Sequence, residues 1–194
     1  FQAGQYINLF VEIEGVETAR PYAISSSSSQ RDYYDLTVKR VPDGFVTHYL
    51  LDNVEAGQQF LSTGPMGTFY HNPIFHGKDL VFLAGGSGIA PAMSMLKEVL
   101  DRELDYQFHF IYASSYIDDV IFLDELRTLA QQHQNFNLTE VISRPLESYQ
   151  GLTGHLNADL IQNLVGDVKQ KMFYVCGPTA FHDFCKSQLL SLDV

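Results

Sequence analysis

Hydrophobic and polar residues alternate in several short segments within residues 1–73. In GQYINLFVEI (residues 4–13) the two faces carry, respectively, Tyr6, Asn8 and Phe10, and Ile7, Leu9 and Val11. A period of two predicts a β-strand. YDLTVKRV (34–41) and QQFLS (58–62) are also predicted strands, with Gly, Pro, Asp and Ser between them. One short helix is expected from near Val46 through HYLLDNV. The pattern favours an antiparallel barrel or sandwich.

After Lys78 the pattern changes. Four short apolar runs, LVFLA, FHFIYA, NLTEVI and MFYVC, each predict a strand. Apolar residues at helical spacing lie between them: Met93, Leu96 and Leu100; Phe122, Leu126 and Leu129; Leu160 and Leu164. Alternating strands and helices predict a parallel sheet with helices on both faces. We therefore expect two domains, residues 1–73 and 78–194, joined across HNPIFHGK (71–78).

Charge and cysteine content narrow the class of protein. A net charge of −11 over 194 residues argues against binding to nucleic acid or an anionic membrane, but leaves a basic protein partner open. No apolar run approaches the roughly 20 residues of a membrane-spanning helix. Cys176 and Cys185 do not form the pattern of a disulfide framework, a zinc site or a four-thiolate iron–sulfur cluster. We expect no metal in this chain and a cytoplasmic location.

The stretch VFLAGGSGIAPAMSML (81–96) joins a predicted strand to a predicted helix through Gly85, Gly86 and Gly88. Glycine costs backbone entropy there, and its usual benefit is that a ligand can approach the backbone closely. Amide groups and the dipole at such a helix start can hold a pyrophosphate, and Pro91 suits the first helical turn. The spacing is not G-x-G-x-x-G, so a tight turn without a ligand is the alternative interpretation.

Four other stretches are candidates for a ligand site. YVCGPTAF (174–181) is again strand, turn and helix, with Cys176 at the end of the strand. RPYAISS (20–26) places Arg20 and Tyr22 on one strand face, suited to a phosphate and a flat ring. DGFVTHYL (43–50) begins a helix at a glycine, with Thr47 in its first turn, and GPMGTF (64–69) is a turn. Singly, each also has an ordinary structural explanation, such as a small buried cysteine or a surface pair.

In this order, RPYA, GFVT, GPMGTF, AGGSGIAP and CGPT resemble the motifs of the ferredoxin–NADP reductase-like flavoprotein superfamily. The resemblance covers essentially the whole chain and is closest to the reductase components of bacterial oxygenases and to NAD(P)H:flavin reductases. It implies a flavin-binding antiparallel Greek-key β-barrel followed by an α/β parallel-sheet nucleotide-binding domain. It also implies an enzyme that passes hydride from NAD(P)H to FAD.

The same resemblance assigns residues to the cofactors. Those expected at the flavin are Arg20, Tyr22, Ala23, Ile24, Val38, Lys39, Gly44, Phe45, Val46 and Thr47. Those expected at the nicotinamide cofactor are Gly85, Gly86, Ser87, Gly88, Ser114, Cys176, Gly177 and Pro178. Tyr22, Ala23 and Cys176 are the catalytic candidates, and the amides of residues 44–47 would bind a pyrophosphate, which favours FAD over FMN. No histidine is assigned a catalytic role.

Three features depart from the family pattern. Ala23 stands where the family usually carries Ser or Thr, whose hydroxyl reaches flavin N5. The chain begins inside the barrel, since the family has strands before AGQY, and it ends before the family's last strand. We therefore expect a piece of a longer protein, with room for an iron–sulfur domain beyond either end.

Three functions are compatible with these motifs. The first is an electron-transfer reductase whose acceptor is a protein, such as an iron–sulfur domain or an oxygenase. The second is a reductase of free flavin or small acceptors. The third is a non-catalytic flavin- or nucleotide-binding regulatory module, to which Ala23 gives some weight.

The preferred nicotinamide cofactor is expected to be NADH. The loop after QFHFIYA carries Asp118 and Asp119 and no Arg or Lys to bind a 2′-phosphate. Arg144, in VISRP, is the residue that would reverse this preference.

Overall fold

The computed structural model describes residues 1–194, and by its internal contacts the chain forms two units. One unit comprises Phe1–His71 and Ala90–Asp101, and the other comprises Asn72–Ile89 and Arg102–Val194. Helix α2 (Ile89–Asp101) therefore belongs to the first unit from its second residue onward. None of the helices combines the length and apolar composition that crossing a bilayer requires.

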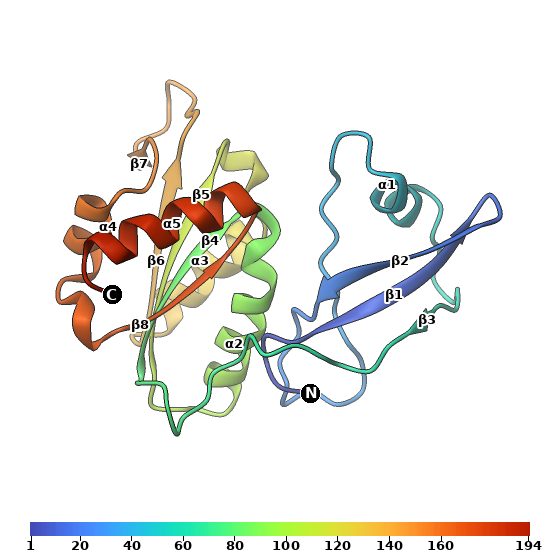
Figure 1. Ribbon diagram of the computed structural model, residues 1–194, viewed down its shortest axis with the longest axis horizontal. Helices are drawn as coiled ribbons and strands as arrows, with labels where there is room; N and C mark the ends of the chain where they lie inside the picture. The colour runs from blue at the N-terminus through green and yellow to red at the C-terminus, as the bar shows by residue number, and fades with distance from the viewer. The chain divides into compact units, whose positions relative to one another are not determined.

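The first unit is built on a three-stranded antiparallel sheet with the strand order β2-β1-β3 (Figure 1). Its strands are β1 (Tyr6–Ile13), β2 (Val16–Ala23) and β3 (Leu61–Ser62). Glu14 and Gly15 both have positive φ, as a two-residue hairpin between right-twisted strands requires. The alternation in β1 points Val11 and Ile13 into a small core that they share with Val46 of helix α1 (Phe45–Asp52).

Residues 34–41 do not form the strand that the sequence predicts. Leu36 makes one isolated bridge to Ile24, and no ladder follows. The backbone of Asp35 bonds instead to the serine run that follows β2. The Asp35 amide donates to Ser26 Oγ over 3.1 Å, and its carbonyl accepts from the Ser25 amide over 2.8 Å. Such side-chain bonds compete with a regular ladder. The predicted strand at 58–62 is likewise reduced to β3.

The same serine run anchors helix α2 within the first unit. Ser94 Oγ donates to the Ser26 carbonyl over 2.6 Å, and Ser28 Oγ donates to Glu98 Oε1 over 2.5 Å. Ser29 Oγ donates to Asp101 Oδ2 over 2.7 Å. Residues 25–28 are all buried, so a stretch of low complexity is part of the packed interior here.

The second unit holds a five-stranded parallel sheet with the order β7-β6-β5-β4-β8 (Figure 1). The strands are β4 (Asp79–Gly85), β5 (Gln107–Ser114), β6 (Phe136–Ile142), β7 (Leu152–Thr153) and β8 (Met172–Cys176). The helices are α3 (Leu123–Gln132), α4 (Ala158–Val165) and α5 (Thr179–Ser191), with 3₁₀ turns η1 (Gly86–Gly88), η2 (Ile117–Asp119) and η3 (Val168–Gln170). The predicted fold class, an antiparallel β region followed by an α/β parallel-sheet region, is confirmed.

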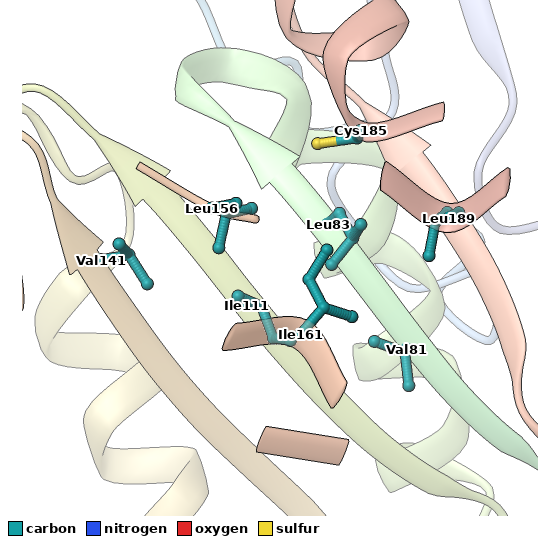
Figure 2. Close-up of a cluster of buried hydrophobic side chains, with 8 residues drawn as sticks. All are labelled: Val81, Leu83, Ile111, Val141, Leu156, Ile161, Cys185 and Leu189. Carbon is teal, nitrogen blue, oxygen red and sulfur yellow. The ribbon is translucent and has the colours of Figure 1, made fainter. Parts of the chain in front are cut away.

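Both faces of the parallel sheet are covered, which explains why its strands are continuous apolar runs in the sequence. One face packs Val81, Leu83 and Ile111 against Ile161 of α4 and Leu189 of α5 (Figure 2). The other face carries a cluster of aromatic rings. Its members are Phe82, Phe108, Phe110, Phe136 and Tyr174.

Candidate functional site

The glycine turn lies where β4 ends at the carboxyl edge of the parallel sheet. Gly86 has φ +54°, a left-handed conformation that glycine adopts at little cost. Residues 86–88 form η1 and lead directly into α2, whose first turn carries no acidic side chain. Amides at a helix start whose first turn carries no carboxylate are suited to an anion such as a pyrophosphate.

A second turn, after β8, packs directly against the glycine turn. The register pairs Ala84 with Cys176, so both strands end at the same edge of the sheet. A Cβ at Gly88 would lie only 2.1 Å from the Cys176 carbonyl oxygen, and a Cβ at Gly177 would lie 3.2 Å from Gly85 Cα. The glycines thus allow two backbones to meet. Sequence reasoning assigned them to a ligand and missed this packing.

Cys176 is half-buried at the end of β8. Burial raises the pKa of its thiol, while a hydrogen bond from the Gly177 amide lowers it. The net shift is upward, so the thiol is protonated near neutral pH and is not an activated nucleophile. Pro178 follows as the N-cap of α5. Phe181, in the first turn of α5, lies against the turn, because a Cβ at Gly85 would meet its ring at 2.9 Å.

The loops after β5 and β6 are joined by backbone hydrogen bonds. Ser114 and Ser115 carbonyls accept from the amides of Ser143 and Arg144, over 3.0 and 2.8 Å. The backbone of Arg144 therefore lies beside the segment that leads to η2, where Asp118 and Asp119 are exposed.

In the first unit, Arg20 and Tyr22 project from the same face of β2. They stand opposite Leu9 and Ile7 of β1, and Leu9 packs into the core that α1 covers. Arg20 is exposed, and its Nη1 donates to Thr18 Oγ1 and to the Ala19 carbonyl, both over 2.8 Å. Burial raises the pKa of the Tyr22 hydroxyl, with Arg20 acting in the opposite direction, so the phenol is neutral at physiological pH.

The start of α1 lies on this same face of the antiparallel sheet. Its N-cap, Gly44, could not carry a side chain without disturbance, because a Cβ there would lie 2.2 Å from Thr47 Oγ1. No side chain caps this end and its first turn has no acidic residue, so the free amides are suited to an anion.

The remaining predicted flavin residues divide by exposure. Ala23, Val38, Lys39 and Phe45 keep accessible surface. Ile24 and Val46 are buried, at 0% and 3% exposure, and the Ile24 amide donates to the Gln5 carbonyl. Their side chains therefore belong to the core.

Sequence reasoning also missed Tyr112, which is buried beneath the glycine turn. Its hydroxyl donates to the Gly86 carbonyl over 2.8 Å and accepts from the Ile121 amide over 3.1 Å. The only signal in the sequence was a tyrosine near the carboxyl end of the predicted strand FHFIYA.

A parallel sheet with open amide turns at its carboxyl edge, preceded by an antiparallel β unit with a bare helix start, defines the class of flavin- and nucleotide-binding oxidoreductases. The chain belongs to the family described as "Oxidoreductase NAD-binding domain", whose model matches residues 82–187. Residues 1–71 match the "Oxidoreductase FAD-binding domain". The protein thus contains an FAD-binding and an NAD-binding oxidoreductase domain.

Individual relatives agree with this assignment. The chain is 34% identical to a glycine betaine monooxygenase reductase subunit of Pseudomonas aeruginosa, over 97% of this chain and 52% of the relative. It is 26% identical to an anthranilate 1,2-dioxygenase electron transfer component of Acinetobacter baylyi, over 97% and 54%. The chain therefore spans about half the length of these curated relatives.

Solved structures show the same fold. The FAD/NAD-binding domain of nitric oxide dioxygenase from Vibrio cholerae superimposes with a TM-score of 0.88 at 27% identity, covering 100% of this chain and 81% of that one. A ferredoxin NADP+ reductase from Neisseria gonorrhoeae, solved with FAD and NADP, superimposes with a TM-score of 0.80 at 25% identity, covering 98% and 79%.

Proposed function

We propose that this chain is the cofactor-binding part of a reductase that transfers hydride from NADH to FAD and then passes electrons to a protein acceptor, such as an iron–sulfur domain or an oxygenase. The observation that carries the proposal is the glycine turn at residues 86–88, which lies at the carboxyl edge of the parallel sheet beside the cysteine turn and leads into a helix whose first turn carries no acidic side chain. Amides at such a helix start can hold the pyrophosphate of a dinucleotide. The FAD-binding part would extend over residues 1–73 and the NAD-binding part over 78–194. The proposed location is the cytoplasm.

In the FAD-binding part, side chains would hold the phosphates and the ring. Arg20 is exposed on the strand face and free to reach a phosphate, once it gives up its two local hydrogen bonds. Tyr22 and Ala23 would lie against the ring, with Val38 and Lys39 beside it. The amides of residues 44–47 would hold the pyrophosphate, once the Gly44 amide gives up its hydrogen bond to the Val41 carbonyl, and this favours FAD over FMN.

In the NAD-binding part, backbone would do most of the binding. The amides of Gly86, Ser87 and Gly88 would hold the pyrophosphate. Ser114 would lie near the adenosine ribose, with the acidic loop beyond it favouring NADH. Cys176, Gly177 and Pro178 would line the nicotinamide end.

Bound together, the two cofactors supply the hydride chemistry themselves. The chain's own contribution is to bind and orient them. The Cys176 thiol is protonated and partly buried, so it adds contact and excludes water without supplying a base. No side chain here needs to move a proton for the hydride step.

The proposal is tested on the full-length protein. We expect it to retain an oxidised-flavin spectrum through gel filtration, to be bleached anaerobically by NADH, and to reduce the one-electron acceptor ferricyanide without added flavin. A requirement for added free flavin would favour a flavin reductase. Flavin that NADH does not bleach would overturn the enzymatic function in favour of a regulatory module.

A further inference from the structure

Tyr112 joins two loops that are separate in the sequence. Its side chain is fully buried in β5 next to Ala84, its register partner in β4. The single phenolic proton is donated to the Gly86 carbonyl, and the hydroxyl oxygen accepts from the Ile121 amide. Burial raises the pKa of this phenol to about 12, so it remains a donor throughout the physiological range.

The first of these hydrogen bonds, together with one that the Ile89 amide donates to the same carbonyl, fixes the orientation of a peptide group in the glycine turn. The Gly86–Ser87 peptide is trans, so its carbonyl and its N–H point in opposite directions. Because the carbonyl points at the buried Tyr112 hydroxyl, the Ser87 amide points away from it. Ser87 is exposed, which leaves this part of the turn accessible to a ligand.

The second hydrogen bond fixes the end of the acidic loop. Ile121 follows η2, which contains Asp118 and Asp119. The next residue, Phe122, has φ +63°, a conformation that a bulky side chain adopts only when its surroundings hold it. The Tyr112 hydroxyl, bonded to the neighbouring amide, is one such restraint.

We propose that Tyr112 is a positioning residue that couples the pyrophosphate-binding turn to the loop that contacts the adenosine ribose. Both loops would then bind the nicotinamide cofactor in one fixed geometry. This inference rests on the proposed function. Without the phenol, the Gly86 carbonyl would keep only the hydrogen bond from the Ile89 amide, which lies within the same turn. The buried phenol adds a restraint from the sheet before the ligand binds, as preorganised sites generally do.

The chain offers a matched control for a purely structural role. Tyr174 in β8 is also buried in the parallel sheet, and its hydroxyl lies 2.9 Å from His76 Nδ1. Tyr174→Phe removes one buried phenolic hydroxyl, as Tyr112→Phe does, but at a distance along the chain from both loops. Each variant keeps its aromatic ring and therefore most of its packing.

The experiment measures ADP-ribose binding to the full-length, flavin-loaded protein by calorimetry, since this probe does not reduce the flavin. We expect Tyr112→Phe to weaken binding roughly tenfold, the effect of about one well-placed hydrogen bond. The KM for NADH should rise by a similar factor, kcat should change less than about twofold, and the flavin spectrum should stay the same. Tyr174→Phe should leave ADP-ribose affinity within about twofold.

Two results would overturn the coupling role alone: unchanged ADP-ribose affinity in Tyr112→Phe, or equal weakening in both variants. If the parent protein binds no ADP-ribose and NADH does not bleach its flavin, the proposed function fails as well. If Tyr112→Phe does not fold, hydrogen exchange on the parent protein tests the coupling role instead. ADP-ribose must then protect residues 86–89 and 115–122 together, and protection of only one segment contradicts the inference.

Discussion

The two sheets of this protein present their candidate ligand groups in different ways. In the parallel sheet these groups are backbone turns at the strand ends, packed so closely that Gly88 has no room for a side chain. In the antiparallel sheet they are side chains in the second half of β2, where Arg20 is exposed. The first arrangement ties binding to the integrity of the fold, whereas the second separates them. Substitutions in the two regions should therefore have different consequences.

The largest effect is expected at the packed turns. Gly88→Ala places a Cβ 2.1 Å from the Cys176 carbonyl oxygen, so the two turns must separate. We expect a loss of about 2–4 kcal/mol in the free energy of unfolding, together with weakened NADH binding. Urea denaturation measures the first quantity. Gly77→Ala is the control, because the nearest atom to its Cβ would be 4.0 Å away. Equal stability of the two variants would show that the turns tolerate separation.

Arg20→Ala, in contrast, should weaken cofactor binding without changing the stability of the fold. We expect FAD affinity to fall by roughly 1–3 kcal/mol, the range for charge-assisted hydrogen bonds, while the unfolding midpoint of the apoprotein stays unchanged. Flavin fluorescence titration of the full-length apoprotein gives the affinity. Arg31→Ala, another exposed arginine of the same unit, should bind FAD normally. If both variants bind equally well, Arg20 is only a surface residue.

Cofactor preference tests the loops beyond the parallel sheet. We expect kcat/KM to be at least severalfold higher with NADH than with NADPH, because Asp118 and Asp119 repel a 2′-phosphate. Arg144→Ala should then change little. A preference for NADPH would refute this assignment, and loss of that preference in Arg144→Ala would identify the phosphate ligand.

The smallest effect is expected at the amino end of the parallel sheet. His109 on β5 shares a hydrogen bond of 2.8 Å with Thr139 Oγ1. Burial, then the charge of Lys171, lowers its pKa, while Asp79 acts in the opposite direction. The folded state thus favours neutral His109, and the unfolded chain takes up the proton first as pH falls below about 6.5. His109 therefore contributes stability above that pH, which is lost as pH falls through its lower folded pKa.

His109→Gln should flatten the decline of stability between about pH 7 and 5, because Gln does not titrate. Denaturant unfolding across that range measures the slope. An identical slope in the parent and the variant would show that His109 keeps an ordinary pKa.

Most of the fold could be predicted from the sequence, because periodicity reports burial directly. The alternation in residues 4–13 identifies β1, and the apolar runs identify β4, β5, β6 and β8. Residues 34–41 have strand composition, but a strand also needs a partner. Their neighbour is a serine run whose hydroxyls form hydrogen bonds with the amide and the carbonyl of Asp35. No local sequence pattern predicts that pairing.

The candidate site was predictable to the extent that its motifs are contiguous. Arg20 with Tyr22 and the glycine turn could be located from short stretches of sequence. The contact between Gly88 and the Cys176 peptide could not, because it joins segments that are 88 residues apart. The role of Tyr112 could not be predicted for the same reason, since its two hydrogen-bond partners lie on separate loops.

The division of the chain has a practical consequence for protein engineering. Residues 90–101 belong with the N-terminal unit although they follow the start of the second one, so the chain passes from one unit to the other after residues 71, 89 and 101. A gene cut anywhere between residues 72 and 78 would leave the N-terminal fragment without helix α2 and its bonds to the serine run. Chimeras that exchange a flavin module between reductases should therefore carry this helix with it.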